Sequence, residues 1–598
     1  MDATNAQNTD YAYNKASVQT RVTYPDDSPA PGSSRGYVVY SYDAALRLTR
    51  INHQDDTNTD VVYDNMGRKL TLTKGDETDS FAYAATGQVT LAKRGLWIAV
   101  LRSYDGLGRL TRETQQNGRD RNVDYAYDKG GNVLTLTYPF SGAVQTTYDA
   151  LGRALTVKRN GSQLAAYTYT GYRPKSQTFE TGANDVTLSM TYDGASGGRL
   201  TRMAYSQTGN TSLPDFSYGF DAASDITRKT FNNQSGANED YTYDSLHRLT
   251  HTTFGQRASG GSTPYKGYIY DDQGNHLTQD DNGATTVGLF NAVNEMTKRG
   301  ANDVLYDACG NLTKDDTGKS YYYDRQNFLT RVDDNASNRI ASYAYDALNR
   351  RIEKDVAATG ISRFYWTTNW RLLEETDDAG TPDVQRYYIW APGSAGYIDD
   401  QIAFVDSTGG SDVTYYACRN HNYCIVAMLN TSGGVVERYD YNPYGERIVL
   451  DPDYAADADG ISDIINPVGF QGLFHDDETG LIYVRNRYLK PTLGRWMQRD
   501  PKRYSDGQNL YEYARSRSVV LMDPAGTCSD WQPVGEPSVQ PAYWRFVRDW
   551  VHHPDFLDRF FNPGANLTDG YRSDRGYPIS DEEPIYDETY FELKMTYN

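Results

Sequence analysis

The sequence predicts an all-β protein in which a repeated hairpin builds one long antiparallel sheet. Three observations lead to this prediction: a Tyr-Asp unit that recurs through most of the chain, a surplus of tyrosine, and one stretch, Gly469–Pro501, dense in turn residues and aromatic strand formers. The chain has 52 Tyr against 18 Phe and 8 Trp. Tyrosine favours half-buried strands, and its ring can be buried while its hydroxyl reaches water, so stacked tyrosines can replace an aliphatic core.

The repeat unit reads Tyr-Asp-x-x-Gly-Arg-Leu, and neighbouring copies often lie 21 residues apart, as Tyr42 and Tyr63 do. A fixed period of this kind is the signature of a repeat array. Clear copies begin at Tyr42, Tyr63, Tyr104, Tyr148, Tyr243, Tyr323 and Tyr345, and weaker ones at Tyr83, Tyr127, Tyr169, Tyr192, Tyr218, Tyr270 and Tyr306.

Each residue of the unit has a physical role in a hairpin. Tyrosine ends a strand, aspartate opens the turn by accepting backbone amide hydrogen bonds, and the residue at the glycine position takes a left-handed conformation. Arg-Leu-Thr then starts the return strand, and the following residues alternate, as in Arg68–Thr73. One unit cannot bury its apolar face alone, so neighbours must stack. We therefore interpret these tyrosines and aspartates as stacking rings and turn caps rather than as ligands.

The composition argues against several classes of function. The chain has 598 residues and a net charge of −20, which disfavours nucleic acid as a partner. The sequence lacks a run of 18 apolar residues, so we expect no transmembrane helix, and its first residues do not resemble a signal peptide. It also lacks the ligand spacing of zinc or calcium sites, and we expect neither a metal nor another cofactor.

The composition changes in the last third of the chain. The repeat rhythm ends near Asp400, and within Gly469–Pro501 we expect two strands, Leu481–Tyr488 and Arg495–Gln498, separated by a turn at Lys490–Gly494. We therefore divide the chain into a repeat array at residues 1–400, a closing region at 401–527 and a C-terminal segment at 528–598.

The C-terminal segment is acidic, and its first half is rich in tryptophan and phenylalanine. A helix is predicted over Tyr543–Phe561, interrupted at Pro554. Asp549, His552, His553 and Asp555 do not follow a catalytic or metal-binding spacing, because adjacent histidines point to different faces. We interpret this segment as a folded plug or tail.

The Tyr-Asp units, together with Val435–Gly445 and Gly469–Gly526, resemble the RHS or YD-repeat proteins. This family includes polymorphic bacterial toxins, the C components of insecticidal toxin complexes and the animal teneurins. The resemblance implies that the sheet spirals into a hollow shell. It also implies that an RHS-repeat-associated core domain, here residues 401–527, caps the shell, which encloses the variable segment 528–598 as cargo.

The resemblance further implies an intramolecular aspartyl protease, since two carboxylates beside one peptide bond can activate water and protonate the leaving group. The family's two motifs match Arg499–Pro501 and Asp523–Thr527, so the catalytic residues would be Asp500 and Asp523. Arg499 would hold a carboxylate in its ionised form, and the cut would fall between Thr527 and Cys528.

Two departures from the family pattern lie near this bond. Thr527 stands where the family has leucine, and Arg517-Ser518 stands where it has Asn-Pro. Because Asp-Pro is also an ordinary turn dipeptide, the alternative is that both aspartates are turn caps.

The leading interpretation is a shell-forming YD-repeat protein that encloses or displays its own C-terminal segment, with self-cleavage after the core. One alternative is a cell-surface adhesion module that binds a carbohydrate or a protein without catalysis. Another is a self-processing toxin with residues 528–598 as effector. Each of them implies a secreted or cell-surface location, although the chain begins within the repeats.

Overall fold

The computed structural model describes residues 10–527, apart from residues 25–35, 97, 118–119, 172, 183, 195–197, 235–236, 254–264, 378–383, 394–396 and 506. Consecutive strands pair antiparallel almost throughout, so the prediction of an all-β protein is confirmed. The predicted C-terminal helix Tyr543–Phe561, the polar group Asp549, His552, His553 and Asp555, and Cys528 lie outside the described residues.

The first 27 strands form one sheet. They are β1 (Asp10–Tyr13), β2 (Gln19–Thr23), β3 (Tyr37–Tyr42), β4 (Leu48–Asn52), β5 (Asn58–Tyr63), β6 (Lys69–Lys74), β7 (Glu77–Tyr83), β8 (Val89–Arg94), β9 (Ile98–Tyr104), β10 (Leu110–Asn117), β11 (Asp120–Tyr127), β12 (Val133–Thr137), β13 (Ala143–Tyr148), β14 (Ala154–Arg159), β15 (Ser162–Thr170), β16 (Arg173–Phe179), β17 (Val186–Tyr192), β18 (Leu200–Ser206), β19 (Asp215–Phe220), β20 (Ile226–Phe231), β21 (Asn238–Tyr243), β22 (Leu249–Thr253), β23 (Tyr265–Tyr270), β24 (His276–Asp281), β25 (Ala284–Phe290), β26 (Met296–Arg299) and β27 (Asn302–Asp303).

Two smaller sheets follow, of 14 and 4 strands. The larger holds β28 (Leu305–Tyr306), β29 (Leu312–Lys314), β30 (Ser320–Tyr323), β31 (Leu329–Asp333), β32 (Arg339–Tyr345), β33 (Arg351–Val356), β34 (Gly360–Trp366), β35 (Leu372–Asp377), β36 (Val384–Trp390), β37 (Gln401–Asp406), β38 (Val413–Arg419), β39 (Ile425–Leu429), β40 (Val435–Tyr441) and β41 (Arg447–Leu450). The smaller holds β42 (Phe474–Asp476), β43 (Leu481–Val484), β44 (Arg487–Lys490) and β45 (Arg495–Trp496); short 3-10 turns occur at η2 (Phe470–Gly472), η3 (Arg503–Ser505) and η4 (Ala514–Ser516).

The turn chemistry of the repeat is as predicted. In the unit that follows β5, Asp64 Oδ1 accepts the backbone N–H groups of Met66 and Arg68 at 2.9 and 2.8 Å, and Gly67 has φ +81°. Asp64 Oδ2 accepts a hydrogen bond from Arg68 Nε at 2.7 Å. The same left-handed position is occupied without glycine in other units, by Leu46, His247 and Asn349.

Each unit is also fastened to its neighbours. The Tyr63 hydroxyl donates to the Leu48 carbonyl at 2.8 Å, and the Arg68 guanidinium lies 4.8 Å from the centre of the Tyr83 ring. The tyrosine contact recurs along both large sheets, which makes a ladder of mostly half-buried rings with satisfied hydroxyls. It is made by Tyr83, Tyr104, Tyr148, Tyr169, Tyr243, Tyr270, Tyr323 and Tyr345.

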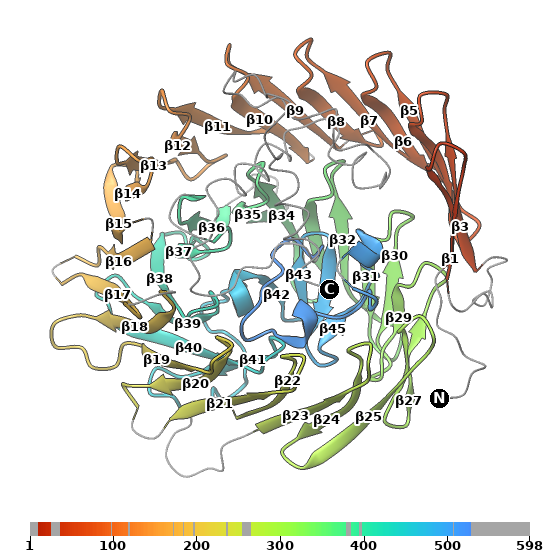
Figure 1. The fold of residues 1–598 in the computed structure, drawn as a ribbon. Helices are drawn as coiled ribbons and strands as arrows, with labels where there is room; N and C mark the ends of the chain where they lie inside the picture. Colours follow the sequence, from red (N-terminus) through yellow and green to blue (C-terminus); the bar gives the residue numbers. More distant parts are fainter. Residues whose placement is uncertain are drawn as a thin grey trace, which may run out of the picture.

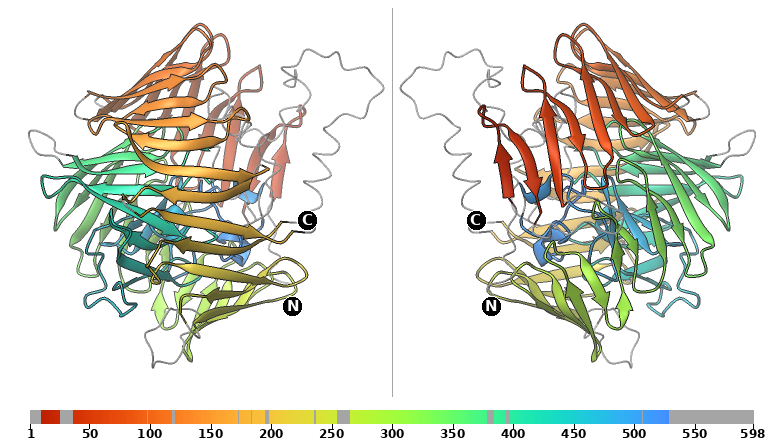
Figure 2. Two further views of the ribbon diagram at one scale, coloured as in Figure 1. Left: turned by 90° about the vertical axis from the view of Figure 1, so that its left-hand side faces the viewer. Right: turned by 90° about the vertical axis from the view of Figure 1, so that its right-hand side faces the viewer.

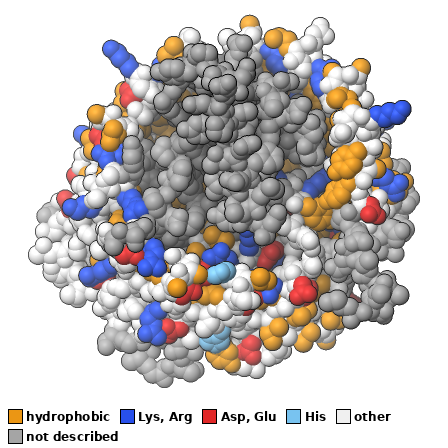
Figure 3. All heavy atoms as spheres, viewed as in Figure 1, with side chains coloured by type: hydrophobic (Ala, Val, Ile, Leu, Met, Phe, Trp, Pro, Cys, Tyr) orange, Lys and Arg blue, Asp and Glu red, His pale blue; other side chains and the backbone are white. Residues whose placement is uncertain are grey.

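The sheet winds around an axis for more than one revolution (Figure 1). β1 to β27 make the first revolution, and β28 to β41 continue into a second that is displaced along the axis (Figure 2). Bonds between residues 235 and 250 positions apart join the two: Asn117 Nδ2 donates to the Ile352 carbonyl, and the Tyr138 hydroxyl to the Tyr388 carbonyl. Strands β33 and β36 of the second revolution therefore lie against the end of β10 and the residue after β12 in the first. On the face seen in Figure 3, acidic and basic side chains are mixed around the rim.

The four-stranded sheet β42–β45 lies inside the ring of strands (Figure 1). The single strand predicted at Leu481–Tyr488 is wrong: it is two strands, β43 and β44, joined by a turn at Arg485 and Asn486. Arg485 has φ +47°, which reverses the chain inside an otherwise extended run. The predicted turn at Lys490–Gly494 is confirmed by the Gly494 N–H bond to the Lys490 carbonyl, and β45 is shorter than the strand expected there.

The boundary expected at residue 400 falls inside the 14-stranded sheet, where β36 pairs with β37 across it. The division into residues 1–400, 401–527 and 528–598 stays a prediction. Within the described residues there is no helix with the length and apolar character needed to cross a membrane.

Candidate active site

The two aspartates predicted to be catalytic meet at one arginine. Asp500 follows β45, Asp523 follows the turn after η4, and Arg487 opens β44. One terminal nitrogen of Arg487 lies 3.0 Å from Asp500 Oδ2 and 3.2 Å from Asp523 Oδ2. All three side chains are at least 95% buried. A single buried cation thus offsets the charge of two carboxylates that are 23 positions apart in the sequence.

The strand order and one loop hold these groups in place. The Leu510 carbonyl accepts the backbone N–H of Asp500 at 3.0 Å and Arg487 Nη1 at 3.3 Å. The Trp496 ring lies 4.1 Å from the Arg487 guanidinium and covers one of its faces. Asp500 Oδ1 accepts the Lys502 N–H at 2.6 Å, whereas Oδ2 is buried and faces the Arg487 guanidinium at 3.0 Å.

The residues just before the predicted cut touch the same cluster. Arg487 Nε donates to the Gly526 carbonyl at 2.7 Å, and the Thr527 N–H donates to Asp523 Oδ1 at 3.1 Å. Thr527 is half-buried. Gly526 therefore contacts the shared arginine and Thr527 contacts Asp523, and the Thr527 bond is also the turn cap that the repeat aspartates make to the residue four positions on.

Arg499, the third predicted site residue, is engaged elsewhere. Its guanidinium pairs with Glu295 at 2.7 Å and with Gln54 Oε1 at 2.8 Å, and it also contacts the Tyr511 hydroxyl. These contacts fasten the core to the shell wall. The charge next to Asp500 comes from Arg487, which sequence reasoning missed. The sequence feature that could have indicated Arg487 is an arginine within an otherwise apolar strand, because a charged side chain in such a strand needs a buried partner of opposite charge.

Arg517, which replaces asparagine in the family pattern, also contacts the shell. Its Nη2 lies 2.5 Å from Asp225 Oδ1 at the start of β20. The neighbouring Ser518 carbonyl accepts Gln471 Nε2 at 3.0 Å. The altered positions therefore still fix the segment that leads to Asp523.

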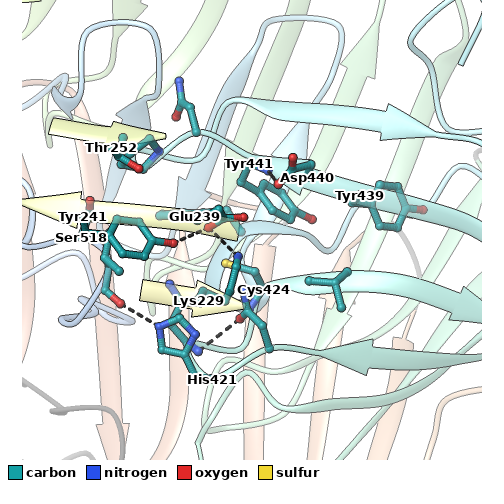
Figure 4. A pocket seen from close by; sticks show the side chains of 17 residues that line it. Lys229, Glu239, Tyr241, Thr252, His421, Cys424, Tyr439, Asp440, Tyr441 and Ser518 are labelled. Atoms are coloured by element: carbon teal, nitrogen blue, oxygen red, sulfur yellow. Dashed lines mark hydrogen bonds and ion pairs between the residues drawn. The ribbon is translucent and has the colours of Figure 1, made fainter. Parts of the chain in front are cut away.

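A polar cavity of about 40 Å³ lies between β20–β21 and the turn before β39 (Figure 4). Lys229 and Glu239 pair there at 2.6 Å, and His421 Nε2 lies 3.0 Å from the Val519 carbonyl. Burial raises the pKa of Cys424 to about 12 and lowers that of His421 to about 3. At neutral pH the thiol is protonated and the imidazole neutral, so this cavity lacks an activated nucleophile. The described part of the chain has no group of three or more His, Cys, Asp or Glu side chains arranged to hold a metal ion.

The family model described as the teneurin YD-shell matches residues 34–173 and 160–517. The chain belongs to this YD-shell family. The match includes Asp500 and the turn at Arg485 and Asn486 and ends just before Asp523. The resemblance seen in the Tyr-Asp units and in Gly469–Pro501 is thereby confirmed.

Relatives of this YD-shell chain include toxins. It is 30% identical to the tRNA3(Ser)-specific nuclease WapA of Bacillus spizizenii over 269 residues, 43% of this chain and 11% of the relative. It is 25% identical to toxin subunit YenC2 of Yersinia entomophaga over 513 residues, 74% of this chain and 51% of the relative. The chain thus spans about a tenth to a half of these two relatives.

The shell fold also recurs in a solved structure. The crystal structure of TcdB2-TccC3 without hypervariable C-terminal region superposes with a TM-score of 0.69 over 87% of this chain and 30% of that one, at 17% identity. The fold prediction of a YD-repeat shell is confirmed by this match together with the family assignment.

Proposed function

We propose that this YD-shell chain cuts itself after Thr527 and so separates residues 528–598 from the shell as its cargo. The observation that carries the proposal is the cluster of Asp500, Asp523 and Arg487, which touches the two residues before the predicted cut. Both aspartates also cap the turns that follow them, but a turn cap by itself does not need a shared buried arginine. The toxin relatives, and the solved structure of TcdB2-TccC3 without hypervariable C-terminal region, support a C-terminal segment that can be separated from the shell.

The proposed reaction is peptide hydrolysis. Asp500 takes a proton from water while the water oxygen attacks the Thr527 carbonyl carbon. The bond to the Cys528 nitrogen then breaks, and Asp523, protonated in the reacting form, gives its proton to the leaving amine. The carboxylic acid formed at Thr527 returns its proton to Asp523, and Asp500 passes the proton taken from water to the new amine. The products are a carboxylate at Thr527 and an ammonium group at Cys528. Arg487 stays charged throughout and offsets the carboxylates.

The test is synthesis of the full chain, purification and a denaturing gel with intact-mass measurement. The wild type is expected to give two fragments, residues 1–527 and 528–598. Asp500→Asn and Asp523→Asn are expected to lower the cleavage rate at least about 100-fold, which is the scale of general acid–base catalysis. Asp476→Asn is the matched control, because Asp476 is an equally buried aspartate whose partner is another arginine, Arg351. An uncut wild-type chain would refute the proposal.

Enclosure of the cargo and export of the chain are part of the same proposal. The toxin names of its relatives support delivery outside the producing cell, with the segment 528–598 as the shell's own partner. Protection of that segment from added protease in the Asp500→Asn chain would support enclosure, and its rapid digestion would contradict it.

A further inference from the structure

The turn between β43 and β44 holds three consecutive carbonyl groups next to the predicted cut. Arg485 Nη1 donates to the Pro524 carbonyl, Asn486 Nδ2 to the Ala525 carbonyl at 2.9 Å, and Arg487 Nε to the Gly526 carbonyl at 2.7 Å. Three successive side chains therefore hold three successive carbonyls in the same order. Only the last of these contacts involves the residue that bridges the two aspartates.

Gly526 allows this close approach. It has φ +65°, and a Cβ built there would lie 2.4 Å from the Val484 carbonyl oxygen and 3.1 Å from the Arg487 backbone nitrogen. The segment lies flush against the β43–β44 turn, with no room for a side chain. A shift by one residue would put Ala525 or Thr527 in this place and is excluded by the same clash.

The shell wall holds the first member of this set. Arg485 forms a two-pronged ion pair with Asp399, with Nη1 3.0 Å from Oδ2 and Nη2 2.5 Å from Oδ1. It also donates to the Trp370 carbonyl at 3.3 Å. Trp370 lies in the turn that joins β34 to β35, and Asp399 lies just before β37 of the second revolution. Asp399 is 2% exposed, so removal of Arg485 would leave this buried carboxyl without its ion-pair partner.

We propose that Arg485 and Asn486 are positioning residues that fix which peptide bond meets the aspartates. These two residues are called the clamp, and Asp399 of the shell wall holds Arg485 in the orientation that binds the Pro524 carbonyl. Cleavage then depends on closure of the second revolution around the core. The clamp contacts only residues before the cut, so the new C-terminus at Thr527 stays bound while the following segment is freed. This inference rests on the proposed self-cleavage for its rate effect, but not for the ordering of residues 524–526.

The rate test follows cleavage of the full chain during cell-free synthesis, with samples stopped in denaturant. Arg485→Ala, Asn486→Ala and Asp399→Asn are expected to slow cleavage about 10- to 100-fold, because loss of positioning acts directly on the reaction. Intact mass is expected to show additional cut sites in Asn486→Ala, an effect that destabilisation alone would not produce. Arg485→Lys is expected to recover part of the rate.

Lys490→Ala and Asp315→Asn are the matched controls. They break another buried core–shell ion pair, 2.6 Å long, that also starts on β44 but does not touch residues 524–526. These controls should cleave at the wild-type rate and at one bond. Clamp variants that cleave like the wild type, or controls that slow as much as the clamp variants, would overturn the proposal.

A second measurement separates failure of the clamp from failure of the cleavage. In the uncut Asp500→Asn chain, hydrogen exchange of the peptide that covers residues 520–527 is expected to be slow, and to become at least tenfold faster when Asn486→Ala or Asp399→Asn is added. If the wild type is never cut, this exchange result still decides whether the clamp holds. Equal exchange in the single and double variants would contradict it.

Discussion

The same turn occurs in both revolutions of the shell with very different surroundings. Asp64 and Arg68 of the first revolution pair at 2.7 Å and leave 17% and 18% of their side chains exposed. Asp346 and Arg350 of the second pair at 2.8 Å and are 2% and 1% exposed, and Arg350 also reaches Glu113 of the first revolution at 2.6 Å. The unit thus folds by local rules, while its energetic weight depends on whether another revolution lies against it.

The tyrosines show the same contrast. The Tyr63 hydroxyl donates to the Leu48 carbonyl of the neighbouring unit in the first revolution. The Tyr345 hydroxyl makes the corresponding bond to Leu329 at 2.7 Å and also lies 3.1 Å from the Tyr488 hydroxyl on β44. Turns of the second revolution therefore contact the four-stranded core sheet as well as their neighbours in the shell. Asp399 and Trp370 do the same through Arg485, which binds the segment before the predicted cut.

Replacement of the turn arginine should give the largest difference in stability between the two revolutions. Arg350→Ala leaves Glu113 and Asp346 buried with reduced compensation and is expected to cost about 3–5 kcal/mol. Arg68→Ala opens a partly solvated pair, and its effect should be clearly smaller, because water replaces the lost partner. Urea unfolding midpoints measure both. Equal losses would show that burial between revolutions does not set the strength of the turn.

Substitution of the turn glycines should give the next largest difference. At Gly445, φ is +93° and an added Cβ would lie 2.7 Å from Phe470 and 2.8 Å from Ile482 of the core. At Gly67, φ is +81° and the nearest atom would be 3.7 Å away. Gly67→Ala should cost about 1 kcal/mol from the left-handed backbone alone. Gly445→Ala should add about 1–3 kcal/mol of overpacking, as thermal midpoints would reveal.

Acid should weaken the contact between shell and core through His276. Burial lowers the pKa of this histidine to about 3, with help from Arg495, Arg299 and Arg248, and its Nδ1 accepts Gln279 Nε2 at 2.8 Å. Because the unfolded side chain titrates near 6.5, its contribution is complete above about pH 6.5 and is lost as the pH falls toward about 3.

His276→Gln should therefore flatten the pH dependence of unfolding in that window by up to about 1.4 kcal/mol per pH unit. Unfolding midpoints between pH 7 and 4 test this. Parallel curves for the wild type and His276→Gln would contradict a buried neutral imidazole.

Much of the site could be read from the sequence, because its parts are local motifs. The family's motifs point to Asp500 and Asp523, and the structure brings both to one arginine, while their catalytic role stays a prediction. The sequence favours Arg499 over Arg487 because Arg499 directly precedes Asp500 in the motif. Only the pairing of β43 with β44 turns Arg487 inward toward the aspartates, while Arg499 points to Glu295.

By itself the sequence determined the hairpin unit, its period and its antiparallel pairing, since a tyrosine, a turn aspartate and a left-handed residue act within a few positions of one another. It did not determine which units become buried, how Asp399 reaches Arg485, or which arginine meets the aspartates. The contact from Arg487 to Asp500 spans 13 positions, that from Asp399 to Arg485 spans 86, and that from Tyr138 to Tyr388 spans 250. They depend on how the sheet curves through more than one revolution. That curvature accumulates from the twist between many neighbouring strands, so it cannot be predicted from any single motif.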